Sequence, residues 1–93
     1  MPSLKAAHIR EQGQNMIIFP LDHTFGHKSD RDRSLALNEL EQRARASGLA
    51  GRAVAFWESA NRTHFIGPRP WHPFLGGLSM RDVMASVNME INW

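Results

Sequence analysis

The chain has 93 residues, of which 42% are hydrophobic and 22% are charged, and its formal net charge is +2. This length and composition predict one small globular domain over residues 1–93, because a second core would not fit and a disordered chain would hold fewer apolar residues. Cysteine is absent, which excludes disulfides, thiol nucleophiles and cysteine-bound zinc. The apolar runs are too short to span a membrane, and the first residues lack the apolar stretch of a secretory signal. We therefore expect a cytoplasmic protein that does not contact the membrane.

The first predicted element is a β-hairpin that ends near Leu21. Apolar and polar residues alternate after Lys5, and Gly13 is suited to a turn. The run Met16–Phe19 is apolar on both alternating faces, which predicts a central strand covered on both sides. Pro20 has no N–H to donate and should end the ladder of this strand. An alternative is that translation starts at Met16 and that the preceding residues are not part of the protein.

A long helix is predicted over about residues 30–47. Ser29 has the side chain of an N-cap, and Asp30 and Asp32 would lie at the positive end of the helix dipole. Leu37, Leu40, Ala44 and, at the margin, Leu35 recur at helical spacing and would form the apolar stripe that packs on a sheet. The helix is therefore expected to cover one face of the sheet.

A second hairpin is predicted from Gly51 to Gly67. In its first strand Val54 and Phe56 would share one face, whereas Ala53, Ala55 and Trp57 would share the other. Residues 59–61 supply a turn, and residues 62–66 return as the partner strand.

The last third of the chain predicts one or two short helices, over about residues 70–77 and 79–85. Pro70 fits a first helical turn, and Ser79 is a candidate N-cap with Asp82 three residues later. The tail fits two patterns. Met80, Val83, Met84 and Val87 recur at helical spacing, whereas Val87, Met89, Ile91 and Trp93 alternate with polar residues, which is strand spacing. The alternatives are a helix, a strand, or a short helix over 79–85 that is followed by a terminal strand. The segment order is thus ββαββα(β). We expect an α+β two-layer sandwich with four to five mostly antiparallel strands.

The stretch "HIREQGQNMIIFPLD", residues 8–22, resembles the start of small uncharacterised bacterial proteins. These carry "HIREQG" before an apolar strand, and later a short helix and a terminal strand with a tryptophan, which correspond here to "FIGPRPWHPFL" and "EINW". The resemblance implies that the hairpin belongs to the protein and that translation does not start at Met16. It also implies a bacterial origin near mobile genetic elements, and it carries no activity.

The stretch "LDHTFGHKSDRDR", residues 21–33, holds the residue types of a metal site. His23 and His27 are four apart, and Asp22 or Asp30 could supply a third ligand. The glutamate of a zinc-protease helix motif is missing between the histidines, and Gly26 disfavours a helix there. We therefore expect neither a metal site nor a cofactor, and these two histidines remain weak candidates.

Hydrolysis would need a histidine base, an aspartate that orients it and a nucleophile or activated water. Neither a nucleophile elbow nor a glycine-rich phosphate loop occurs in the sequence. The side chains that a hydrolytic site could use are Asp22, His23, Ser29, Thr63 and His64. An enzyme is nevertheless not the favoured interpretation, and no catalytic residue is assigned.

A nucleic-acid interface is the alternative function. Lys28, Arg31 and Arg33 gather at the start of the long helix, where backbone N–H groups could also meet a phosphate. Arginines and aromatic residues of the strands could add a stacking surface; these are Arg10, Arg52, Arg62, Arg69, Trp57, His64, Phe65 and Trp71. Composition supports this only weakly, because the net charge is small.

The favoured hypothesis is a non-enzymatic protein-interaction domain that associates with itself, as a homodimer, or with another protein. The second hairpin has apolar residues on both faces, and the long helix can cover only one of them. The other face would need the short helices or a partner subunit. The predicted interaction surface consists of Trp57, Ile66, Trp71 and Phe74.

Overall fold

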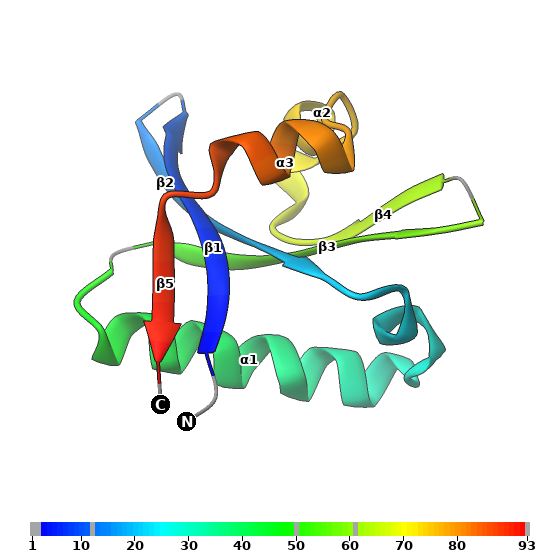
Figure 1. Ribbon diagram of the computed structural model, residues 1–93, viewed down its shortest axis with the longest axis horizontal. Helices are drawn as coiled ribbons and strands as arrows, with labels where there is room; N and C mark the ends of the chain where they lie inside the picture. Colours follow the sequence, from blue (N-terminus) through cyan, green and yellow to red (C-terminus); the bar gives the residue numbers. More distant parts are fainter. Residues whose placement is uncertain (1–2, 12, 50, 61, 93) are drawn as a thin grey trace.

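The computed structural model describes residues 3–11, 13–49, 51–60 and 62–92 (Figure 1). Its first half contains the strands β1 (Ser3–Glu11) and β2 (Gln14–Leu21), the 3-10 helix η1 (His23–His27) and the helix α1 (Asp30–Ala46). The second half contains β3 (Arg52–Ser59), β4 (Arg62–Ile66), the 3-10 helix η2 (Arg69–Trp71), α2 (His72–Leu75), α3 (Met80–Ser86) and β5 (Met89–Asn92). None of the helices in these ranges is long and apolar enough to cross a membrane.

The five strands form one open sheet in the order β4-β3-β2-β1-β5. Three of the four neighbouring pairs are antiparallel, so the predicted mostly antiparallel α+β sheet is confirmed. The exception is the parallel pair of β2 and β3, in which Ile17 lies opposite Ala53. Parallel neighbours need a crossover connection, and η1 and α1 supply it.

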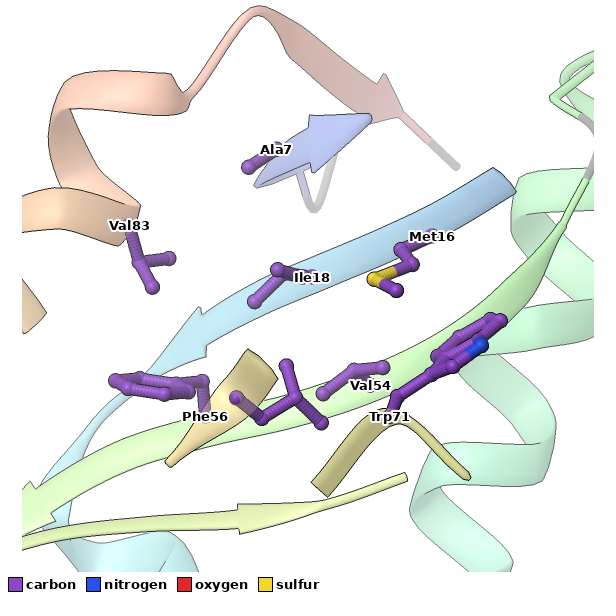
Figure 2. Close-up of a cluster of buried hydrophobic side chains, with 8 residues drawn as sticks. Ala7, Met16, Ile18, Val54, Phe56, Trp71 and Val83 are labelled. Atoms are coloured by element: carbon purple, nitrogen blue, oxygen red, sulfur yellow. The ribbon is translucent and has the colours of Figure 1, made fainter. Parts of the chain in front are cut away.

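Helices cover both faces of the sheet, as Figure 1 shows with α1 below it and α2 and α3 above it. The α1 face buries Ala6, Ile17, Phe19, Ala44, Leu49, Ala53 and Ile91. The opposite face buries the cluster of Figure 2, which consists of Ala7, Met16, Ile18, Val54, Phe56, Trp71, Leu75 and Val83. The expected two layers of sheet and long helix are therefore extended by a third, smaller layer of short helices. Met16–Phe19 is buried on both sides, as its unbroken apolar run predicted.

The predicted long helix is confirmed and begins where its cap residue places it. The Ser29 hydroxyl accepts a hydrogen bond from the Asp32 N–H at 3.2 Å, and Asp30 and Asp32 occupy the first turn. Ala44 is completely buried against the sheet, and Leu37 and Leu40 are half-buried at its margin. Leu35 is exposed, so it lies outside the stripe. Side-chain caps satisfy the free N–H groups at the start of a helix. The first residue of α1 is therefore determined by the cap residue Ser29.

The C-terminal segment contains both a short helix and a strand, which decides among the alternatives that its two overlapping patterns left open. Ser79 and Asp82 form a reciprocal capping box at the start of α3. The backbone N–H and hydroxyl of Ser79 hold the pKa of the Asp82 carboxyl below its usual value, because they bond its charged form. The other predicted short helix, over 70–77, is divided into η2 and α2, and α2 ends at Leu75.

The ladder between β1 and β2 stops before Pro20, whereas the strand β2 continues through it. The β1–β2 register stops at the pair Ala7–Ile18, although both strands continue beyond it. Backbone groups alternate sides along a strand, so the next bonded pair would join Lys5 to Pro20. Proline has no N–H to give to the Lys5 carbonyl. The ladder between β2 and β3 still runs past this point, to Leu21 opposite Trp57, so the prediction that Pro20 ends the ladder holds only on the β1 side.

The β3–β4 hairpin contains a residue whose replacement should stabilise the fold. Ser59 pairs with Arg62, so residues 60 and 61 make the connection, and Ala60 has a φ of 53°. A left-handed conformation is unfavourable for alanine and natural for glycine. We expect Ala60→Gly to raise the free energy of unfolding by about 0.5 kcal/mol, after the larger chain entropy of glycine is subtracted. Urea unfolding followed by circular dichroism measures this change, and a loss of stability would contradict it.

Candidate functional site

The stretch from Asp22 to Arg33 forms the corner that leads from β2 through η1 into α1. The Asp22 carboxylate caps η1 and accepts a hydrogen bond from the Thr24 N–H at 3.3 Å. Phe25 points inward, is 6% exposed and meets the Trp57 ring edge-to-face at 5.0 Å between centroids. The corner is thus held by an aromatic anchor and by two side-chain caps, which are structural roles.

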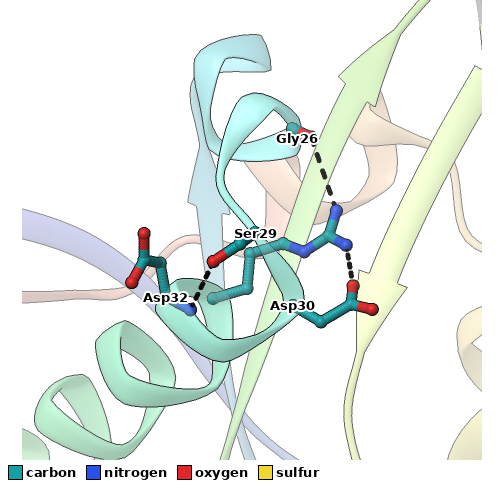
Figure 3. Close-up of polar contacts among 5 residues, drawn as sticks. Gly26, Ser29, Asp30 and Asp32 are labelled. Atoms are coloured by element: carbon teal, nitrogen blue, oxygen red, sulfur yellow. Dashed lines mark hydrogen bonds and ion pairs between the residues drawn. The ribbon is translucent and has the colours of Figure 1, made fainter.

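Arg33 closes this corner (Figure 3). Its guanidinium donates to the Asp30 carboxylate and to the Gly26 carbonyl, the latter at 3.4 Å. It also lies over the Trp57 ring, 5.8 Å from the centroid, where a cation–π attraction adds to the contact. The side chain is only 22% exposed. The predicted phosphate ligand Arg33 is therefore engaged within the chain.

The two histidines of the corner lie on its surface. The His23 Nδ1 atom is 2.6 Å from an Asp22 carboxylate oxygen, and the rings of His23 and His27 are 6.0 Å apart. Within the described ranges, however, no three histidine, aspartate or glutamate side chains gather as a metal site would require. Asp30, the other possible third ligand, pairs with Arg33.

Two residues of a possible hydrolytic site have structural contacts instead. The Ser29 hydroxyl accepts the capping hydrogen bond of α1, and His64 stacks on the Trp57 ring at 5.5 Å. The pair of Asp22 and His23 has the geometry of a base and its orienting carboxylate, yet both side chains are mostly exposed to solvent. Such exposure gives little of the shielding that supports proton transfer in active sites.

The four residues of the predicted interaction surface do not form one surface. Trp57 and Trp71 are only 4% and 8% exposed, so neither ring can contact a partner in the folded domain. Trp57 packs with Phe25 beneath the α1 face, whereas Trp71 belongs to the cluster on the opposite face. Ile66 and Phe74 are half-buried and belong to these same two clusters. The apolar faces that seemed to require a partner are covered by α1, η1 and the short helices.

The predicted nucleic-acid residues are likewise separated. Lys28 and Arg31 are exposed at the start of α1, but Arg52 donates to the Glu41 carboxylate at 3.0 Å. The other arginines of this prediction, Arg10, Arg62 and Arg69, are exposed and lie on β1, β4 and η2. With both tryptophans buried, the arginine and aromatic side chains do not share a stacking surface. Nucleic-acid binding stays a prediction without a site.

A groove that was not expected from the sequence lies on the α1 face, where β1 and β2 separate. It has a volume of about 340 Å³ and is lined by Leu4, Leu21, Phe25, Lys28, Ala36, Glu39, Leu40 and Arg43. A proline inside an otherwise apolar strand was the available signal, because such a proline marks an interrupted ladder. Within the described ranges, two other hollows of about 260 and 390 Å³ lie beside Arg52 and Pro68.

Comparison of the chain with protein-family models, with curated proteins and with solved structures finds no match. The bacterial origin and the neighbourhood of mobile genetic elements, which the resemblance implies, stay predictions. The function has to be argued from the surfaces described above.

Proposed function

We propose that this protein is a cytoplasmic interaction domain that associates with a second copy of itself by pairing β4 with the β4 of that copy. The free backbone of β4 at the edge of the open sheet is the observation that supports the proposal. A strand edge with unpaired N–H and C=O groups is a template for another strand.

The hairpin geometry determines which backbone groups of β4 face outward. A two-residue connection makes Ser59 and Arg62 a hydrogen-bonded pair. Because bonding alternates along antiparallel strands, His64 and Ile66 also bond to β3. The intervening residues Thr63 and Phe65 then point their N–H and C=O groups away from the sheet. For the described part of the chain, no other element bonds to these groups.

The opposite edge of the sheet is better protected. The Asn88 side-chain amide bonds both the N–H and the carbonyl of His8, at 2.9 and 3.0 Å, and so blocks the outer edge of β1. β5 covers the rest of that edge with only four residues, and a short strand is a known device against unwanted pairing. β4 has no proline and no bulge in its five residues, so pairing is easier there.

An antiparallel pair of β4 strands about a two-fold axis would join two five-stranded sheets. Thr63 of one copy would then bond Phe65 of the other, and the two His64 residues would face each other across the axis. The association is isologous, so one substitution changes both halves of the interface.

Proline at Thr63 tests this pairing. The Thr63 N–H faces outward, so Thr63→Pro should keep the fold while removing one donor from each copy. We expect wild-type protein to show a concentration-dependent monomer–dimer equilibrium in sedimentation velocity, and the variant to raise the dissociation constant by roughly a hundredfold.

Glu90→Pro is the matched control, because it removes an outward N–H from β5 on the opposite edge. It should leave the equilibrium of the wild type unchanged, and circular dichroism checks that both variants are folded. A wild-type protein that stays monomeric at millimolar concentration would refute self-association. Equal effects of the two prolines would refute β4 as the interface.

A further inference from the structure

The larger of the two hollows beside Arg52 lies at the end of the sheet where β2 and β3 begin. It has a volume of about 390 Å³ and is lined by Gln14, Arg52, Pro68, Pro70 and Trp71. This volume lies near the lower end of the range for ligand sites, which is roughly 300–1,000 Å³. Two proline rings supply apolar wall, and the arginine and the glutamine supply polar groups. The combination suits a small molecule that has an apolar body and one polar group.

Trp71 directs an unpartnered hydrogen-bond donor into this hollow. Its side chain is only 8% exposed, and its indole N–H has no partner among the described residues. In those same residues, the only buried side-chain nitrogen or oxygen without a partner is Arg33 Nε, so solvent reaches the Trp71 N–H. Figure 2 shows the indole nitrogen on the side of the ring toward the starts of β2 and β3, where Gln14 and Arg52 lie.

Arg52 adds a guanidinium whose orientation is fixed. Its Nε donates to the Glu41 carboxylate at 3.0 Å. The two terminal nitrogens of the guanidinium have no partner in the described part of the chain, and the side chain is 64% exposed. A guanidinium that is held at Nε still presents two parallel N–H groups, whose spacing matches the two oxygens of a carboxylate.

The charges around the hollow favour an anion with a single charge. The Glu41 carboxylate contacts Arg52 and also lies 3.8 Å from an Arg45 terminal nitrogen. One carboxylate therefore faces two guanidinium groups, so these three side chains together carry one positive charge. Among the described residues that line the hollow there is no carboxylate. A singly charged anion would balance this group.

We propose that this hollow binds a small monocarboxylic acid with a compact apolar body. The carboxylate accepts from the terminal nitrogens of Arg52 and from the indole N–H of Trp71, and the body lies against Pro68 and Pro70. Inorganic phosphate fits less well, because it is largely doubly charged at neutral pH and has no apolar part for the proline rings. The site uses neither β4 nor a second copy of the chain, so it stands apart from self-association.

The test is an NMR titration of the ¹⁵N-labelled protein with benzoate, followed through the indole N–H signals of the tryptophans. The Trp71 signal is identified by its absence from the spectrum of Trp71→Phe. We expect it to shift downfield in a saturable manner, with a dissociation constant of roughly 1–10 mM for so small a ligand. Benzamide has nearly the same shape without the charge, and it should bind at least roughly tenfold more weakly.

Two arginine variants provide a matched comparison. Arg52→Gln removes the guanidinium, and we expect it to weaken benzoate binding by roughly tenfold or more. Arg31→Gln makes the same change in net charge at the start of α1, outside the described lining of the hollow, and should leave the affinity unchanged. Both side chains are exposed, so both variants should fold, and their amide spectra check this.

Two tryptophan variants test the indole donor in the same way. Trp71→Phe keeps an aromatic ring in the cluster and removes the N–H, so benzoate should bind roughly three- to tenfold more weakly. Trp57→Phe removes an equally buried indole from the α1 face and should leave the affinity unchanged. The amide signals of Gln14 and Arg52 follow binding in both variants.

Two further ligands separate the sources of an anionic group. Inorganic phosphate is the compact anion, and an acetylated tripeptide that ends in phenylalanine presents a carboxylate on a longer chain. Tighter binding of phosphate than of benzoate, or binding of the tripeptide alone, would overturn the proposal. The same holds for the absence of a saturable Trp71 shift, for equal binding of benzamide, and for equal losses within either pair of variants. Benzoate binding that depends on Arg52 and Trp71, and not on Arg31 and Trp57, would support it.

Discussion

Replacing Phe56 by alanine is expected to lower the free energy of unfolding by about 3–5 kcal/mol. The Phe56 ring is completely buried between β3 and the short helices, and it stacks near Phe65 at 6.4 Å between centroids (Figure 2). Its removal leaves a cavity that a sheet with helices on both faces cannot close by collapse. A domain of this size is stable by only about 5–15 kcal/mol, so the loss is a large part of the total. Urea unfolding followed by circular dichroism measures it.

Phe74→Ala is the control for this prediction. Phe74 is half-buried and packs at the margin of the same cluster. The free energy of unfolding should therefore fall by less than half as much for Phe74→Ala as for Phe56→Ala. Losses of equal size at the two positions would contradict the difference in burial between the Phe56 and Phe74 side chains.

Gly51→Ala should destabilise the fold by about 3 kcal/mol, because both the backbone conformation and the available space oppose a side chain. Gly51 has a φ of 129° at the entry to β3. A Cβ atom there would lie 2.6 Å from the Asn15 carbonyl oxygen and 2.9 Å from its carbon, which are backbone atoms and cannot turn aside. The expected result is a lower melting temperature and a lower urea midpoint, measured by circular dichroism.

Gly13→Ala separates the two causes. Gly13 also has a positive φ, 77°, but a Cβ atom there meets no other atom within 4 Å. This variant should therefore lose only the conformational part, about 1 kcal/mol. If the two alanines cost the same, the close approach of residue 51 to β2 is not a constraint on the fold.

Much of the fold could be predicted because its signals are local. Ser29 and Ser79 mark the starts of α1 and α3, and the caps that they form are those expected from their spacing to Asp32 and Asp82. The alternation of Val54 and Phe56 with Trp57 also assigned the correct faces of β3. Caps and strand alternation act over a few residues, so a single sequence contains them.

The parallel pairing of β2 with β3 could not be predicted in this way. Strand pairing is decided by contacts between residues far apart in the chain, and two hairpins can be joined in either direction. The same reason explains why the burial of the two tryptophans was not predicted. Trp57 and Trp71 are apolar in any arrangement, and only the placement of η1, α1 and the short helices decides that both are buried. Burial by distant elements is a tertiary property that periodicity does not encode.

The candidate site was harder still to predict. Most of the polar residues between Asp22 and Arg33 have the types of a functional site, but caps and a guanidinium clamp account for Ser29, Asp30 and Arg33. The groove depends on how far β1 and β2 stay together. The sequence contains Pro20, which interrupts the ladder, but it does not show that Leu4 and Leu40 line the same groove.

The pairing of β1 with β5 bears on how the domain folds. Ser3 lies opposite Asn92, so β1 pairs with a strand that is far away along the sequence. Contacts of such long sequence separation form late and slow the folding of a domain. Before β5 has paired, the outer edge of β1 and the apolar side chains of Leu4 and Ala6 stay uncovered on that side. An incompletely folded chain therefore offers a strand edge at which aggregation can start.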